Sequence, residues 1–224
     1  MGVKASSGRI HMTAVYLVRH GETEANKAGM LQGQMDVPLS EKGRRQARLV
    51  AEALSGVQLD AVYSSDLSRA RETAEAIMQG RTCPLVLDKR LRELHMGAIS
   101  GLTIEESRQT FPEFHAQLAA DPYGVRRPGG GESRLDLRNR MASALDDIYE
   151  RHKDGRVAVV AHGGSINAVL GIASQDGSWP RLVVENCSVT VIERDDSGWR
   201  TVEVNVCDHL SALAEDAHLP REAN

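Results

Sequence analysis

Short apolar runs of strand length alternate along this chain with segments of helical period, and this alternation limits the fold more than any other feature. The runs at 14–18, 61–63, 84–88 and 157–161 are mostly apolar, as expected for strands covered on both faces. Between them, apolar residues recur every three or four positions at 47–54, 70–77 and 137–148. The pattern predicts an α/β fold, a three-layer α/β/α sandwich around a mostly parallel central sheet.

Two later parts of the chain depart from this pattern. Segments 187–192 and 201–206 alternate polar and apolar residues around a turn-rich RDDSG sequence, which predicts an antiparallel pair at one edge of the sheet. Segment 97–132 is polar and rich in proline and glycine, so we expect an insertion of short helices and loops that forms a lid. We assign 12–212 to one domain, 1–11 to a tag-like or disordered leader, and 213–224 to a C-terminal tail.

Composition argues against several classes of protein. The net charge of −4 provides no broad basic field for a nucleic-acid backbone, and the aromatic content of 4% offers little surface for stacking bases. No run reaches the roughly 18 apolar residues of a membrane span, and no secretory leader is recognisable. Three scattered cysteines without CxxC spacing predict neither disulfides nor zinc. We therefore expect a cytoplasmic protein that binds neither nucleic acid nor membranes.

Polar or charged side chains follow four of the predicted strands, one group after each. These side chains are Arg19 with His20, Arg69, Glu93, and His162. Because ligands of parallel α/β sheets gather at the carboxyl ends of the strands, we expect the five residues to share one edge and form a site. A zinc or manganese pair on the two histidines is disfavoured, since no carboxylate has ligand spacing and neighbouring arginines would repel a cation.

The chain resembles branch 1 of the histidine phosphatase superfamily, the phosphoglycerate-mutase-like proteins. The resemblance runs from Ala14 to about Leu210. Its motifs, in family order, are RHGET, LQGQMDVPLSEKGRRQA, SSDLSRARETA, LRE followed by G, PGGGES and AHGG. The resemblance implies a three-layer α/β fold and phosphoryl transfer through a phosphohistidine, with no metal and no cofactor.

The resemblance also implies a role for each site residue. His20 is expected to be the nucleophile, because a neutral imidazole is suited to attack on a phosphate dianion, and Glu93 the general acid and base. Gly21 is expected to leave room for the phosphate and to accept the other ring N–H of His20. The residues expected to bind phosphate or substrate are Arg19, Arg69 and His162 with Asn26 and Gly163, then Thr23, which orders the phosphate loop, and Gln32 and Gly33, which contact the rest of the substrate.

Three functions remain open at this stage. A phosphatase for small phosphomonoesters is favoured, because Leu94 stands where the family's mutases usually carry arginine. Only about seventy residues separate Glu93 from His162, which predicts a small lid that admits water. A phosphoglycerate mutase of the 2,3-bisphosphoglycerate-dependent type and a non-catalytic phospho-ligand-binding module are the alternatives.

The partner is expected to be a small phosphorylated metabolite, such as a phosphosugar, a phosphoglycerate derivative or a nucleotide-related compound like ribazole phosphate. The motifs do not choose among these, and a homodimer stays open. Arg126 and Arg127 precede the PGGGES motif. They are expected either to meet a second anionic group of the substrate or to be a pair of exposed lid charges.

Overall fold

The computed structural model describes residues 12–174, 179–211 and 213, and these residues contain one mixed six-stranded sheet in the order β3-β2-β4-β1-β5-β6. The strands are β1 (Thr13–Arg19), β2 (Ala61–Ser64), β3 (Leu85–Leu87), β4 (Arg156–Ala161), β5 (Val189–Asp195) and β6 (Gly198–Val206). β3, β2, β4 and β1 run parallel, whereas β5 and β6 add an antiparallel edge. The predicted fold class is confirmed.

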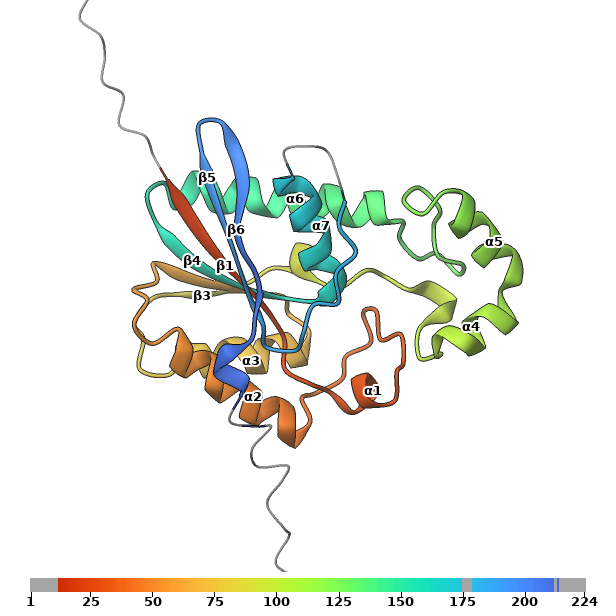
Figure 1. Ribbon diagram of the computed structural model, residues 1–224, viewed down its shortest axis with the longest axis horizontal. Coiled ribbons are helices and arrows are strands. Elements are labelled where there is room, and N and C mark those ends of the chain that lie inside the picture. The colour runs from red at the N-terminus through yellow and green to blue at the C-terminus, as the bar shows by residue number, and fades with distance from the viewer. Residues whose placement is uncertain (1–11, 175–178, 212, 214–224) are drawn as a thin grey trace, which may run out of the picture.

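Helices cover both faces of the sheet (Figure 1). The helices α2 (Glu41–Ala53) and α3 (Ser68–Met78) lie on one face, and α6 (Arg134–Arg151) and α7 (Gly163–Ala173) on the other. Alternate residues of β4 serve the two layers, because side chains of a strand point to opposite faces. Val157 and Val159 pack with the α6 and α7 residues, and Ala158 and Val160 pack with those of α2 and α3. The sheet therefore separates two hydrophobic cores.

The register of the parallel strands brings three chain segments to one point. Arg19 of β1 pairs with Ala161 of β4, and Ser64 of β2 pairs with Val160. The residues that directly follow these strands must therefore emerge side by side at the carboxyl edge of the sheet. His20 and His162 are two of these residues.

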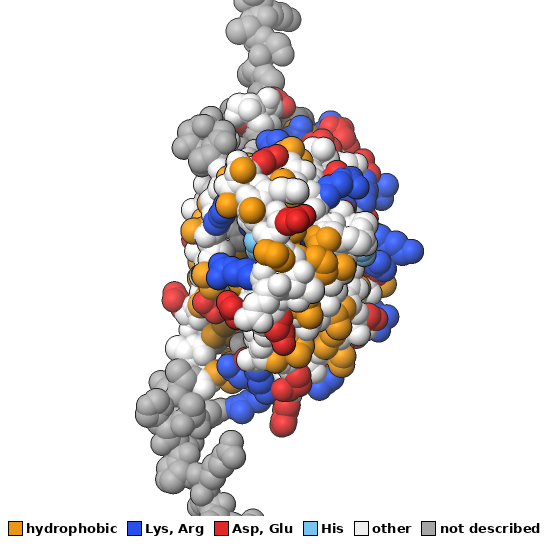
Figure 2. Space-filling view, turned by 90° about the vertical axis from the view of Figure 1, so that its right-hand side faces the viewer, with side chains coloured by type: hydrophobic (Ala, Val, Ile, Leu, Met, Phe, Trp, Pro, Cys, Tyr) orange, Lys and Arg blue, Asp and Glu red, His pale blue; other side chains and the backbone are white. Residues whose placement is uncertain are grey.

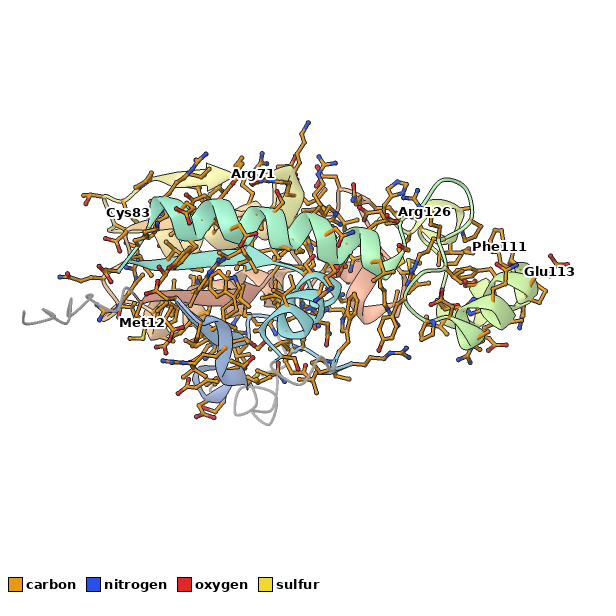
Figure 3. All side chains as sticks on the ribbon, turned by 90° about the horizontal axis from the view of Figure 1, so that it is seen from above. Met12, Arg71, Cys83, Phe111, Glu113 and Arg126 are labelled. Carbon is orange, nitrogen blue, oxygen red and sulfur yellow. The ribbon has the colours of Figure 1, made fainter. Side chains whose placement is uncertain are left out.

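An insertion of short helices lies between β3 and α6, beyond the carboxyl edge (Figures 1 and 3). Two one-turn 3₁₀ segments, η1 (Lys89–Leu91) and η2 (Gly97–Ile99), lead into α4 (Ile104–Thr110) and α5 (Pro112–Ala120). The insertion contacts the loop after the short helix α1 (Glu24–Lys27) through an isolated bridge between Met30 and Thr103. The start of this insertion is thereby tied to the loop that follows the first strand.

The chain's ends bear on the predicted domain boundaries. The expected leader 1–11 and nearly all of the expected tail 213–224 lie outside the described residues, and the last described element is η3 (Asp208–Leu210). The division into leader, domain, lid and tail therefore stays a prediction. Among the helices of the described residues, none has the length and apolar character that crossing a bilayer requires.

Candidate active site

A cavity of about 160 Å³ lies at the carboxyl edge of β1 and brings together eight of the ten residues predicted for the site. These are Arg19, His20, Asn26, Gln32, Gly33, Arg69, Glu93 and Gly163; Met30, Leu31 and Met96 complete the lining. Figure 2 views this end of the molecule and shows pale blue histidine atoms beside a hollow. The grouping expected from the strand ends is therefore present in the structure.

The hydrogen bonds of His20 define its tautomer. Nδ1 of the ring lies 2.7 Å from the carbonyl oxygen of Gly21. Nε2 of the ring accepts a hydrogen bond from Nε of Arg69 at 3.3 Å. Because an arginine N–H can only donate, Nε2 must carry the lone pair and Nδ1 the proton. Burial, with the nearby cations of Arg69 and Arg19, holds the pKa of His20 well below its usual range. The imidazole is therefore neutral, with its nucleophilic nitrogen toward Arg69.

The expectation that Gly21 is needed to leave room for the phosphate is wrong. A Cβ at this position would lie 2.5 Å from the carbonyl oxygen of Gly43, which belongs to α2. Gly21 is thus required for close packing of the strand end on α2, not for room at the phosphate. Its carbonyl does accept the His20 ring N–H, as the family resemblance implies.

Arg69 is almost completely buried, with 1% of its surface exposed. Its two terminal nitrogens donate to the carbonyls of Met35 and Gly33 at 2.7 and 2.8 Å, which leaves Nε as the donor directed to His20. That Arg69 donates to a phosphate oxygen stays a prediction, and each terminal nitrogen carries a second N–H beyond the one given to these carbonyls. Burial lowers the pKa of Arg69 to about 10, so the side chain stays cationic at neutral pH.

Arg19 and His162 place unsatisfied polar atoms near the same point. Arg19 donates to the Val184 carbonyl through Nη1, but its buried Nε has no hydrogen-bond partner among the described residues. His162 is fully buried, and its ring centroid is 5.0 Å from that of His20. Neither of its ring nitrogens has a hydrogen-bond partner in the part of the chain that the structure describes. Because unpaired buried polar atoms are destabilising, these groups mark a position where a bound anion would supply the missing partners.

Glu93 is held by backbone amides on both carboxylate oxygens. Oε1 accepts from the N–H of Leu94 at 2.7 Å, and Oε2 accepts from Gly164 at the start of α7 at 2.9 Å. A Cβ on Gly164 would lie 2.3 Å from Oε1, so any side chain at this position would require the Glu93 carboxylate to move. Sequence reasoning selected Gly163 and missed Gly164, although the paired glycines after His162 were a visible signal.

The loop after β1 supplies the remaining polar groups. Thr23 and Asn26 form a capping box, in which Oδ1 of Asn26 accepts from the backbone and hydroxyl of Thr23. Asn26 therefore keeps its amide nitrogen as the donor it can offer the cavity, and Thr23 orders the loop without lining the cavity. Gln32 is buried with an unpaired Oε1, and Gly33 adopts a φ of 53° beneath Met96.

Arg140 of α6 is a residue that sequence reasoning missed. Its guanidinium donates to the carbonyls of Arg90, Arg92 and Glu93 at 2.8, 2.6 and 2.8 Å. It also pairs with Glu132 at 2.8 Å, and Glu132 accepts from the backbone N–H of His95. This network fixes the segment that carries Glu93. Glu132 lies in the PGGGES motif, but nothing in the local sequence singled out Arg140.

The two lid arginines differ from each other. Arg126 is exposed and pairs with Asp136 at 2.9 Å. Arg127 is 5% exposed and donates to the carbonyls of Val125 and Glu132, and burial lowers its pKa to about 10. The prediction of an exposed charge is therefore wrong for Arg127. Neither arginine lines the catalytic cavity. In the described part of the chain, no three His, Cys, Asp or Glu side chains lie close enough to hold a metal ion.

Comparisons with known proteins agree with this geometry. Residues 15–207 match the histidine phosphatase superfamily (branch 1). A metal-independent phosphoserine phosphatase of Arabidopsis thaliana is 39% identical over 90% of this chain and 85% of its own length. A probable phosphoglycerate mutase, GpmB, of Escherichia fergusonii is 37% identical over 92% of this chain and 98% of its own.

A solved structure shows the same arrangement of elements. The mycobacterial glucosyl-3-phosphoglycerate phosphatase Rv2419c, in complex with VO3, superposes with a TM-score of 0.74 at 34% identity. The alignment covers 87% of this chain and 99% of that one. A three-layer α/β fold with a histidine- and arginine-lined cavity at its carboxyl edge defines a phosphoryl-transfer class of protein. The chain belongs to the histidine phosphatase superfamily, branch 1.

Proposed function

We propose that this protein is a phosphatase that hydrolyses small phosphomonoesters through a phosphohistidine at His20, without a metal ion. The observation that carries the proposal is the tautomer of His20, whose Nε2 lone pair faces buried Arg69 in a cavity that half-buried Arg19 also lines. A neutral nucleophile suits attack on a phosphate dianion, because no like charge opposes its approach. The names of the phosphoserine and glucosyl-3-phosphoglycerate phosphatases among its relatives support the same reaction.

The first step transfers the phosphoryl group. Nε2 of His20 forms a bond to phosphorus while the bond from phosphorus to the ester oxygen breaks. Protonated Glu93 delivers its proton to that oxygen, and the alcohol leaves. The cations Arg19 and Arg69, with His162, take up the negative charge that spreads over the phosphoryl oxygens. The Nδ1–H bond to Gly21 stabilises the positive charge that the ring gains.

The second step returns the enzyme to its starting state. Water attacks phosphorus, ionised Glu93 takes the water's proton, and the bond from phosphorus to Nε2 breaks. Inorganic phosphate then leaves. The Gly164 amide donates to the Glu93 carboxylate, and Arg140 donates to the backbone carbonyl of the same residue, so Glu93 keeps its position for both proton transfers.

Phosphoglycerate mutase remains the second candidate, because the GpmB relative carries that name. Hydrolysis is favoured by Leu94, whose side chain provides no cation beside the acid to hold a substrate carboxylate. The substrate is proposed to be a small phosphorylated metabolite, and the lid role of the insertion and a cytoplasmic location are part of the same proposal.

Two assays test the proposal. Hydrolysis of p-nitrophenyl phosphate in the presence of EDTA is expected to proceed at the same rate as without EDTA. With 3-phosphoglycerate, release of inorganic phosphate is expected to exceed isomerisation whether or not 2,3-bisphosphoglycerate is added. Isomerisation that dominates and depends on the bisphosphate would establish the mutase instead. If none of p-nitrophenyl phosphate, O-phosphoserine and 3-phosphoglycerate is turned over, both the phosphatase and the mutase assignments are contradicted.

A further inference from the structure

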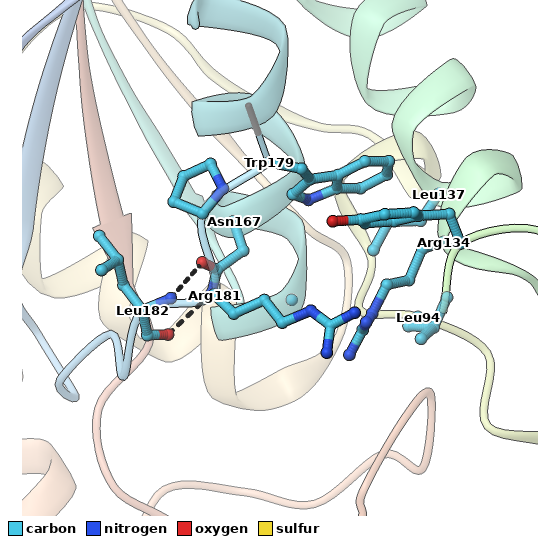
Figure 4. A pocket seen from close by; sticks show the side chains of 10 residues that line it. Leu94, Arg134, Leu137, Asn167, Trp179, Arg181 and Leu182 are labelled. Carbon is cyan, nitrogen blue, oxygen red and sulfur yellow. Dashed lines mark hydrogen bonds between the residues drawn. The ribbon is translucent and has the colours of Figure 1, made fainter. Parts of the chain in front are cut away.

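A second cavity, of about 200 Å³, lies beside the start of α7 (Figure 4). Leu94 and Gly164 line it, whereas the residues just before them, Glu93 and Gly163, line the catalytic cavity. The two cavities share no lining residue, and the hydrogen bond from Gly164 to Glu93 lies between them. The proposed reaction uses no side chain of this second cavity.

The walls of the second cavity are apolar and aromatic. Leu94 and Leu137 provide aliphatic surface, and the ring of Tyr123 stacks on Trp179 with centroids 4.8 Å apart and an interplanar angle of 21°. Trp179 is seated directly on α7, because a Cβ on Gly171 would lie 3.0 Å from its Cγ atom. The cavity therefore offers a firm surface for the carbon skeleton of a small organic molecule.

Two arginines lie together at this cavity. Arg134 comes from the first turn of α6, Arg181 comes from the segment before β5, and their guanidinium groups lie near each other in Figure 4. Burial lowers the pKa of Arg134, and the charge of Arg181 lowers it further. Among the described residues that line the cavity, none is an aspartate or a glutamate. An anion between the two cations would relieve their repulsion.

Hydrogen bonds hold both arginine-bearing segments in place. Asn167 of α7 accepts from the N–H of Leu182 at 2.9 Å and donates to the carbonyls of Leu182 and Gly163, each at 3.0 Å. Arg134 donates to the Pro122 carbonyl at 3.2 Å. The Asn167 bonds thus hold the backbone next to Arg181, and the Pro122 bond holds the Arg134 side chain, which reduces the entropy lost when a ligand binds.

We propose that this cavity, the Arg134–Arg181 pocket, binds the carboxylate or phosphate group of a small organic anion. The anionic group would lie between the two guanidinium groups, which are suited to paired hydrogen bonds with either oxyanion. The carbon skeleton would lie against Leu94 and the stacked Tyr123–Trp179 pair. The anionic group is either a second one on the substrate or belongs to a separate molecule, and the chemistry of recognition is the same.

Binding is measured through Trp179 with succinate as the probe. The chain's two tryptophans are Trp179 and Trp199, so Trp199→Phe leaves Trp179 as the only reporter. We expect succinate to change its fluorescence saturably, and uncharged succinamide to have no effect. Replacing both Arg134 and Arg181 by glutamine should weaken the affinity by about tenfold or more. Arg108→Gln, at an exposed position of α4, is the matched control and should leave the affinity unchanged.

The contradicting results are equally concrete. Identical succinate titrations of the parent and the double glutamine variant, with both folded by thermal melting, would overturn the proposal. An absence of any fluorescence change with both succinate and inorganic phosphate would also overturn it. These binding measurements do not require catalysis, so they can fail while the phosphatase proposal stands.

Kinetics then distinguish the two sources of the anion, and this arm rests on the proposed function. The matched substrates are 3-phosphoglycerate, which has a carboxylate, and glycerol 3-phosphate, which has a hydroxymethyl group in its place. If the anion belongs to the substrate, the double glutamine variant raises KM by about tenfold for 3-phosphoglycerate alone. If it is a separate molecule, both KM values stay unchanged, and succinate alters turnover of both substrates in the parent but not in the variant.

Discussion

The backbone N–H of Gly164 donates to Oε2 of Glu93 at 2.9 Å, and a Cβ on Gly164 would lie 2.3 Å from the other carboxylate oxygen. The first turn of α7 therefore packs directly against the carboxylate that we assign as the general acid. The position of the Glu93 carboxylate therefore depends on the position of α7.

Gly164→Ala is expected to displace the Glu93 carboxylate. A positioned general acid contributes about 10²–10⁴ in rate, so kcat for an alkyl phosphate should fall by about 10²-fold or more. Gly56→Ala, at an exposed position outside both cavities, is the control, because its Cβ would meet no atom within 4 Å. Steady-state assays of both variants with glycerol 3-phosphate make the comparison. Equal losses in the two variants would show that the contact with Glu93 is unimportant.

Glu93→Gln is expected to slow alkyl phosphates far more than p-nitrophenyl phosphate. The nitrophenolate group leaves without needing a proton, whereas an alkoxide requires one. The measurement is the ratio of kcat values for the two substrates in the parent and the variant. A ratio that does not change would remove Glu93 from the role of acid.

Arg140→Gln is expected to reduce both stability and acid catalysis, because it removes the donors to three carbonyls of the 90–93 segment. Loss of hydrogen bonds from a charged group should lower the free energy of unfolding by about 2 kcal/mol, measured in urea. Because Arg140 is a positioning residue, its substitution should also lower the ratio of kcat for alkyl phosphates to kcat for p-nitrophenyl phosphate, as Glu93→Gln does. Arg151→Gln, at the exposed end of the same helix, is the control and should shift neither.

The pH dependence of stability should carry a contribution from His20 and His162. Burial holds the pKa of both rings well below 6.5, so the unfolded chain binds more protons below that pH than the folded protein does. Stability from each ring is therefore fully present above about pH 6.5 and falls by about 1.4 kcal/mol per pH unit below it. Urea unfolding between pH 5 and 7 tests this, and His20→Asn should show a shallower slope. Parallel slopes would contradict the neutral state of the buried ring.

The cluster of His20, Arg69 and His162 was predictable because the carboxyl ends of parallel strands meet at one edge, whatever their separation in the sequence. The packing role of Gly21 was not predictable, because its close contact is with Gly43, a helix residue that no local sequence pattern relates to it. Arg69 was identified as a site residue, but its carbonyl partners in the 33–35 loop depend on the path of that loop.

The Arg134–Arg181 pocket was not predictable for a similar reason. Its lining combines Tyr123 from the insertion with Trp179 and residues of two helices, so only the packed structure places them together. Local sequence signals specify elements and strand ends, but contacts between distant elements depend on tertiary packing.

The most direct measurement is of the covalent intermediate. The protein is mixed briefly with radiolabelled phosphomonoester, quenched in alkali and assayed for protein-bound label, with His20→Asn in parallel. We predict acid-labile label on the parent protein that is absent from His20→Asn. Label that persists at the parent level in His20→Asn would contradict the assignment of His20 as the nucleophile.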